Sequence, residues 1–151
     1  SEFGKFPASW DGRPVMMNHP NIGGMWVSAS IHSVLETYQI GFLANTKLDD
    51  TKLKTEAWLD KDMIDAIGGD ATETYQRVLD GEMVDVSVGA FIDIVEGAGI
   101  HNGKNYAGSW ANVVPDHLAF LSAGVQGACT VEAGCGAPRI NAGSTIFSGM
   151  R

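Results

Sequence analysis

The sequence is short of cysteine, proline, basic residues and long apolar runs. It has two cysteines and five prolines in 151 residues, so the fold does not need a disulfide framework. No segment reaches the roughly 18 apolar residues of a membrane-spanning helix. Ten basic against eighteen acidic residues give a net charge of −8, which argues against nucleic acid and anionic membranes as partners.

The rest of the composition is that of a folded globular protein. Hydrophobic residues make up 44% of the chain and charged residues 19%, unlike disordered proteins. Residues 1–3 lack a methionine and are typical of a vector scar. We therefore expect one domain over residues 4–127. The stretch 128–151 is rich in small residues and is expected to be a C-terminal segment or linker.

The two cysteines, Cys129 and Cys135, are separated by "TVEAG". This spacing matches no common zinc or redox motif, so neither a metal nor another cofactor is expected. The sequence leaves open whether the two thiols pair to close a small loop.

Most of the chain has the pattern of strands and turns, with two short helices. β-Branched and aromatic residues, interrupted by glycine and proline, predict strands within residues 12–20, 23–45 and 53–62. Capping residues followed by apolar spacing predict two helices. These cover residues 61–67 after Asp60 and residues 70–81 with Asp70 as the cap.

A β-hairpin is predicted next. Residues 82–96 alternate, which places Ser87 and Gly89 on the face opposite a valine and isoleucine stripe. Asn102-Gly103 is a turn signal, residues 106–115 are the partner strand, and residues 117–124 read as one more short strand. Because glycine has no side chain, we expect room for a bound peptide backbone beside Ser87.

A strand serine is usually a solvent-facing residue, and a nucleophilic serine needs a base to take its proton. Four histidines are candidates. His101 in the hairpin loop and His32 on a predicted strand have the pattern of exposed residues. His19 and His117 each lie beside a proline and an apolar stretch, at predicted strand edges.

Three separated motifs link these residues. "SWDGRPVMMNHP" resembles the first histidine motif of the tailed-phage capsid maturation (prohead) serine proteases. "VSVGAF" resembles the segment with their nucleophile, and "PDHLAFLSAGVQG" resembles the segment that follows. The resemblance covers residues 6–127. This family is related in fold to the herpesvirus assemblin proteases, whose active-site order is His, Ser, His; here it is His19, Ser87, His117.

The resemblance implies a serine endopeptidase. Ser87 would attack the scissile carbonyl, His19 would be the general base, and His117 would orient His19. Many prohead proteases have an acidic third residue. A neutral histidine there stabilises an imidazolium less well, so modest turnover is expected. The pattern assigns the oxyanion hole to Val125 and Gln126, where assemblins have two arginines, and this loss is the chief departure.

The resemblance also implies the fold and the partners. The expected fold is α+β, mainly β: a small closed or partly closed β-barrel with a few flanking short helices. Substrate would bind as an added strand. Scaffold and capsid proteins are the expected substrates, together with the chain's own "EAGCGAP" and "NAGST". The setting would be a prohead in the cytoplasm of an infected bacterial host. Assemblins are dimers, so a homodimer is a further expectation, although no evident dimerisation helix is present.

Two other functions stay open. A virion structural or scaffold-associated module with the same fold and no activity would account for the missing arginines. An unrelated β-rich binding domain would make the three motifs coincidental.

Overall fold

The computed structural model describes residues 2–101 and 103–138; the expected self-cleavage segment "NAGST" lies outside them. Its elements, in chain order, are η1 (Glu2–Gly4), η2 (Pro7–Trp10), β1 (Pro14–Met17), β2 (Asn21–Ile22), β3 (Met25–Trp26), α1 (His32–Tyr38), β4 (Gln39–Asp49), β5 (Lys52–Leu59), α2 (Lys61–Ile67), α3 (Asp70–Leu79), β6 (Val86–His101) and β7 (Lys104–Phe120).

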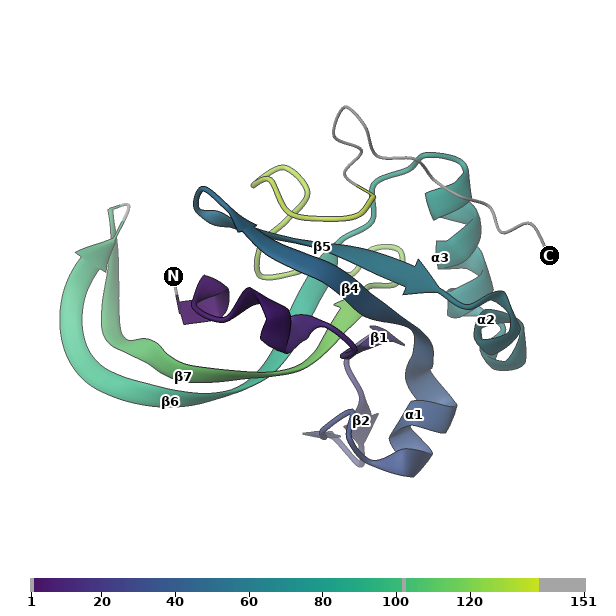
Figure 1. The fold of residues 1–151 in the computed structure, drawn as a ribbon, viewed down its shortest axis with the longest axis horizontal. Helices are drawn as coiled ribbons and strands as arrows, with labels where there is room; N and C mark the ends of the chain where they lie inside the picture. The colour runs from purple at the N-terminus through teal and green to yellow at the C-terminus, as the bar shows by residue number, and fades with distance from the viewer. Residues whose placement is uncertain (1, 102, 139–151) are drawn as a thin grey trace.

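Five strands form one sheet in the order β5-β4-β1-β7-β6. The short β1 is central, antiparallel to β4 and parallel to β7. Both β4–β5 and β6–β7 are antiparallel hairpins. The α+β, mainly β class is thus confirmed. Over the described residues the sheet is open, with β5 and β6 as its two edges, so these strands do not close a barrel (Figure 1).

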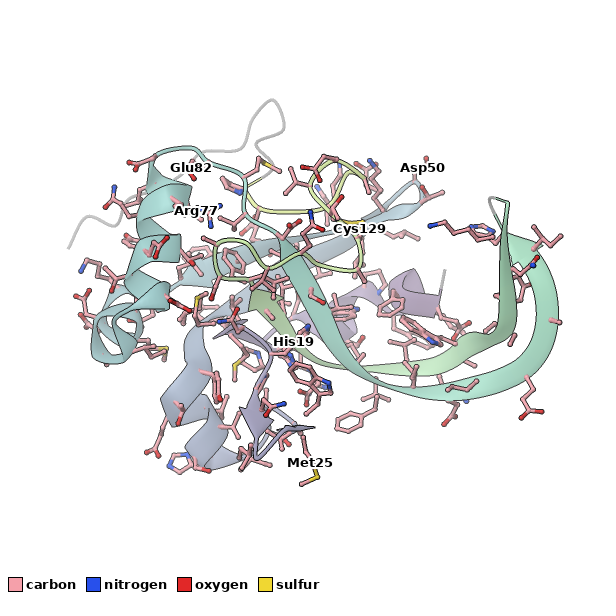
Figure 2. The ribbon with its side chains drawn as sticks, turned by 180° about the vertical axis from the view of Figure 1, so that it is seen from behind. His19, Met25, Asp50, Arg77, Glu82 and Cys129 are labelled. Carbon is pink, nitrogen blue, oxygen red and sulfur yellow. A yellow bond between two sulfur atoms is a disulfide. The ribbon has the colours of Figure 1, made fainter. Side chains whose placement is uncertain are left out.

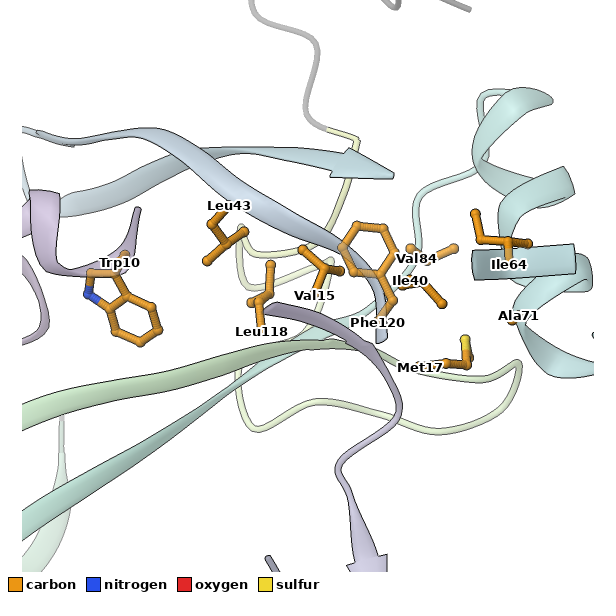
Figure 3. Packing of buried hydrophobic residues seen from close by; sticks show 10 residues of the cluster. All are labelled: Trp10, Val15, Met17, Ile40, Leu43, Ile64, Ala71, Val84, Leu118 and Phe120. Atoms are coloured by element: carbon orange, nitrogen blue, oxygen red, sulfur yellow. The ribbon is translucent and has the colours of Figure 1, made fainter. Parts of the chain in front are cut away.

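The main core lies on one face of this sheet. Trp10 closes it at one end, and Ile64 and Ala71 from α2 and α3 close it at the other (Figure 3). Burying such large apolar side chains contributes about 1.5–3 kcal/mol each. A smaller cluster of Met16, Ala29 and Val34 covers the other face. Both faces of the central strands are therefore sheltered from water.

The two predicted helices are present, and one cap differs. Asp60 caps α2, because its carboxylate accepts hydrogen bonds from the N–H groups of Asp62 and Met63. Asp70 was expected to cap α3, but Gly69 holds that position. The Asp70 carboxylate accepts a hydrogen bond from the Ser122 hydroxyl instead. No helix in the described ranges is long and apolar enough to cross a membrane.

A third helix, α1, replaces part of a predicted strand. His32 is its first residue, so the expectation of an exposed strand histidine was wrong in its structure; the side chain lies within 3.3 Å of Glu36 one turn later. Val34, Leu35 and Tyr38 pack beside Met16. A spacing of three and four residues places apolar side chains on one face of a helix, and here that face packs against the sheet.

The predicted hairpin is confirmed, with a longer second strand than expected. β7 runs without a break from Lys104 to Phe120, so His117 lies inside a strand and not at a strand edge. The register between β6 and β7 shifts at three places, after Gly89, after Phe91 and after Glu96, and these shifts interrupt the simple alternation that was predicted. Such bulges bend and twist a strand pair. The hairpin extends out from the rest of the molecule, and its outer end bends toward the side on which the β4–β5 turn lies (Figure 1).

The first and last described residues of the chain pack against the sheet and its hairpin. The Phe3 ring packs against Trp10 and Trp110, with centroids 6.1 and 5.5 Å away. Cys129 and Cys135 form a disulfide. Residue 137 pairs with residue 84 through two backbone hydrogen bonds.

Candidate active site

Ser87 lies at the base of the hairpin, on the edge strand β6. It faces Ala119 across the strand pair, and Gly89 faces His117. Directly opposed residues of an antiparallel pair point to the same side, as do residues two apart on one strand. Ser87 and His117 are therefore diagonal neighbours on one face. Such pairs have Cα atoms about 7–8 Å apart, within reach of long side chains.

Gly89 makes room for His117. A Cβ atom on Gly89 would lie 2.0 Å from Cε1 of His117 and 2.4 Å from its Nδ1. We expected the glycine to leave space for a ligand, and this was wrong, because the imidazole ring occupies that space. Any larger residue at this position would push the ring away.

His19 is held in place by the residue before it. Asn18 has a left-handed φ of 62°, which turns the chain sharply after β1. Its N–H donates to the Phe120 carbonyl at 2.8 Å. Its side-chain amide exchanges two hydrogen bonds with Ser122, at 2.7 and 2.9 Å. The clamp ties His19 to the end of β7, at the base of the hairpin (Figure 2).

The two histidines meet directly. His19 Nδ1 and His117 Nε2 are 2.7 Å apart, a hydrogen-bond distance, although the residues are far apart in sequence. His117 is buried and His19 half-buried. The edge of Trp26 packs on His19, with ring centroids 5.7 Å apart. The structure thus joins two of the three residues proposed from the sequence.

The surroundings of His19 favour the neutral form of its imidazole. Burial lowers the pKa of its imidazole below 6.5, and the charge of His117 lowers it further. Both effects penalise the charged form. His19 is therefore neutral at pH 7, as a general base must be before it accepts a proton.

Asp116 is the third residue that contacts the two histidines' hydrogen-bonded row, through His117. It was not identified from the sequence. Its Oδ2 lies 2.7 Å from His117 Nδ1 and accepts the Ala29 N–H at 2.8 Å, while Oδ1 accepts the Ser28 hydroxyl at 2.5 Å. Burial opposes ionisation of this carboxylate. The hydrogen bonds from Ala29, Ser28 and His117 outweigh it and lower the pKa below its ordinary value.

The reason Asp116 was missed is geometric. Consecutive strand residues point to opposite faces, so an aspartate directly before a histidine is not expected to touch it. Here Gly89 pairs with His117 and Ala90 with Pro115, which leaves Asp116 as an extra, bulged residue. A bulge re-aims side chains, and this one brings the carboxylate beside the ring.

Ser87 itself is half-buried. Within the described part of the chain its hydroxyl makes no hydrogen bond, to His19 or to another residue. The imidazole of His19 has no partner there at its Nε2 atom. The expected pair of nucleophile and base thus shares one face of the sheet without a direct hydrogen bond.

The expected oxyanion residues lie in the turn after β7. The Val125 N–H donates to the Ser122 carbonyl at 3.0 Å, so this donor is already used. Val125 and Gln126 line a pocket of about 240 Å³ together with Asp85 and Leu121. Asp85 and Leu121 continue the rows of Ser87 and Ala119, so the pocket lies one step further along the same face.

The described side chains offer acid-base chemistry. No group of three or more His, Cys, Asp or Glu side chains in residues 2–101 and 103–138 is arranged to hold a metal ion. What these residues do form is a hydrogen-bonded row of Asp116, His117 and His19.

The chain matches no protein-family model, no curated protein and no solved structure. The chemistry available to the protein is therefore argued from the geometry of its own residues.

Proposed function

We propose that the protein is a serine endopeptidase with Ser87 as nucleophile, His19 as general base and His117 as the residue that orients His19. One observation carries the proposal: the hydrogen bond between His19 and His117, formed on the sheet face that holds Ser87. A base oriented by a third group is what a weakly nucleophilic hydroxyl requires.

The proposed reaction follows from these positions. His19 Nε2 takes the Ser87 proton as Oγ bonds to the scissile carbonyl carbon, and the carbonyl electron pair becomes the oxyanion. The proton then passes from His19 to the leaving amine, and water repeats the sequence to release the acyl group. The reaction needs Ser87 Oγ within hydrogen-bond reach of His19 Nε2, and in apo enzymes such catalytic hydrogen bonds often tighten only when substrate binds.

The substrate would bind along the outer edge of β6 from Val88 onward, because Ala137 and Gly127 lie against the backbone of residues 84 and 86. Leu121 N–H donates to the Asp85 carbonyl. In an antiparallel pair, the backbone N–H and C=O groups of every second residue point to the same side, so those of Asp85 and Ser87 point toward β7 and those of Val88 point outward. An extended peptide added here would pass directly beside Ser87. The exposed Trp26, which packs on His19, offers an apolar contact to the side chains of this peptide.

The proposal extends to the biological setting and to the fold relationship. Scaffold and capsid proteins of a phage prohead are the proposed substrates, and the net charge of −8 suits basic scaffold segments. A partly closed barrel of the assemblin type is the proposed fold. The curvature of the β6–β7 hairpin supports it, and closure would need the β5 and β6 edges to approach.

The test is covalent labelling with a fluorophosphonate, read by intact mass and peptide mapping. We expect one adduct, on Ser87. The adduct should be lost in Ser87→Ala and His19→Ala and kept in Ser109→Ala, a matched exposed serine on β7. An adduct on the folded Ser87→Ala variant, or no adduct on the folded parent, would overturn the proposal.

The second candidate is a virion structural module without activity. The occupied Val125 N–H and the absence of the two arginines favour it, since loss of one oxyanion donor costs about 10²–10³-fold in rate. A folded parent that gives no adduct, with prohead assembly unchanged by Ser87→Ala, is the outcome that this candidate requires.

A further inference from the structure

We propose that Asp116 is a positioning residue that orders the protons along the row Asp116, His117, His19, so that His19 presents an unprotonated Nε2 atom to Ser87. The ordering of the first three groups stands on their contacts alone. Only its last step, toward Ser87, rests on the proposed protease function.

The order begins at the carboxylate, because an ionised carboxylate only accepts hydrogen bonds. Three donors surround Asp116: the Ser28 hydroxyl, the Ala29 N–H and the His117 ring. Charge-assisted bonds of this kind favour the ionised form. His117 Nδ1, 2.7 Å from Oδ2, must therefore carry a proton and donate it.

The same logic passes through the first ring. A neutral imidazole has one N–H and one lone pair, so the protonated Nδ1 of His117 leaves a lone pair on its Nε2. That atom lies 2.7 Å from His19 Nδ1. His19 Nδ1 must then be the donor, which leaves the lone pair of His19 on Nε2.

This tautomer is the one that the reaction needs. When His19 Nε2 takes the Ser87 proton, the ring becomes an imidazolium that still donates from Nδ1 to His117. The negative charge of Asp116 lies one ring further on and stabilises this cation through His117. The histidine in the third position therefore relays the effect of an acidic residue and does not replace it.

Two devices hold the row in place. Gly89 opens the slot for the His117 ring, and any Cβ there would overlap it. The segment before α1 supplies the two anchors of the carboxylate, Ser28 and Ala29. Asp116 touches His117 and no reacting atom, so its effect on the reaction is indirect.

The first test reads the tautomers without any enzyme assay. In protein labelled with ¹⁵N-histidine, at a pH where the rings are neutral, ¹⁵N chemical shifts distinguish a protonated Nδ1 from a protonated Nε2. We expect Nδ1–H for both His19 and His117. A protonated Nε2 on His117 would overturn the proposal.

The second test removes the acceptor. Asp116→Asn replaces the carboxylate by an amide that also donates, so we expect the Nδ1–H preference of both rings to weaken. The fluorophosphonate labelling rate should fall about 10- to 100-fold, by analogy with the loss of a carboxylate that orients a metal-bound histidine. Asp93→Asn makes the same change at an exposed β6 carboxylate and should alter neither. Unchanged tautomers and rate in Asp116→Asn contradict the proposal.

Ser28→Ala is the milder variant if Asp116→Asn does not fold. It removes one of the three donors, and we expect a smaller decrease in labelling rate with the Nδ1–H tautomers retained. If His117 is protonated at Nε2 and Ser87 still forms an adduct, the proposed proton order is refuted while the proposed protease function stands. If both rings have the expected tautomers but Ser87 forms no adduct, the proposed proton order stands and the proposed protease function is refuted.

Discussion

The base and the outer arm of the β6–β7 hairpin are the same two strands in two environments. At the base, residues 115–120 are buried, and β7 is flanked by β1 as well as β6. Along the arm, large apolar side chains stand in solvent: Phe91 is 59% exposed, Ile94 69% and Trp110 54%. Backbone pairing is continuous through both regions apart from bulges, so pairing alone does not create the site.

Burial from a third strand makes the difference. β1 supplies the cover at the base, whereas the contacts of the arm outside the hairpin include those of the N-terminal segment, with Phe3 on Trp110 and the Glu2 carboxylate on the Asn112 N–H. Two histidines of the hairpin show the effect. His117 is 5% exposed and hydrogen-bonded at both ring nitrogens, while His101 stands exposed at the arm tip. Hydrogen-bond partners at the ring nitrogens are what give a histidine a fixed tautomer.

The largest expected difference in stability between base and arm comes from replacing one phenylalanine in each region. Phe120→Ala empties a core position that is 2% exposed, and we expect the free energy of unfolding to fall by about 3–5 kcal/mol. Phe91→Ala in the arm should change it by less than about 0.5 kcal/mol. Urea denaturation measures both. Similar losses would show that the arm is packed as tightly as the base.

Two glycines of β6, one beside His117 and one in the arm, test whether the His117 ring needs the space that Gly89 leaves. Gly89→Ala forces the imidazole aside, so we expect a loss of about 1–3 kcal/mol in stability and loss of Ser87 labelling. Gly97→Ala meets no atom within 4 Å and should leave both unchanged. Thermal denaturation and labelling give the two values. A neutral Gly89→Ala would mean that the ring does not need this space.

The pH dependence follows from the lowered pKa of His19. The neutral base persists to lower pH than an ordinary histidine, so we expect the acid limb of the labelling rate to have its midpoint below pH 6.5. His117 and, behind it, Asp116 face this ring. Asp116→Asn removes a negative charge and should move the limb still lower. His101→Gln at the arm tip should leave it in place. A midpoint above 6.5 contradicts the account.

The same pKa shift makes stability depend on pH. Because the folded state binds the His19 proton more weakly than the unfolded state, the contribution of His19 is fully present above pH 6.5 and decreases as the pH falls below it. His19→Gln removes this dependence. Urea denaturation of both proteins between pH 5 and pH 8 should therefore give curves that converge at the acid end.

The smallest effect is expected at the apolar edge of the site. Trp26 packs on His19 and is 74% exposed, so Trp26→Ala should raise KM for a peptide substrate several-fold with little change in stability. Trp110→Ala in the arm is the matched variant and should leave KM unchanged. Equal effects would place substrate contacts on the arm as well.

Much of the fold followed from local pattern. The hairpin turn, the Asp60 cap and the strand of Ser87 were predicted, because turn chemistry, capping and alternation are local signals. The α1 helix was not, since its apolar spacing over Val34, Leu35 and Tyr38 was hidden among β-branched and aromatic neighbours. Closure of the sheet could not be decided, because edge pairing depends on contacts that no short segment encodes.

The site was predicted in part for the same reason. Motif order pointed to His19, Ser87 and His117, and the structure brings the two histidines together. Asp116 was missed because its contact depends on a bulge, and the role of Gly89 was wrong because the occupant of its space comes from the facing strand. Both depend on the partner strand and not on the local sequence.

The most direct test of the central claim is the distance between Ser87 Oγ and His19 Nε2 in a crystal structure of the protein. We expect the two atoms within about 2.6–3.2 Å, or bridged by one water, with His19 Nδ1 still bonded to His117. A separation of more than about 10 Å, far beyond the reach of proton transfer, would contradict the account.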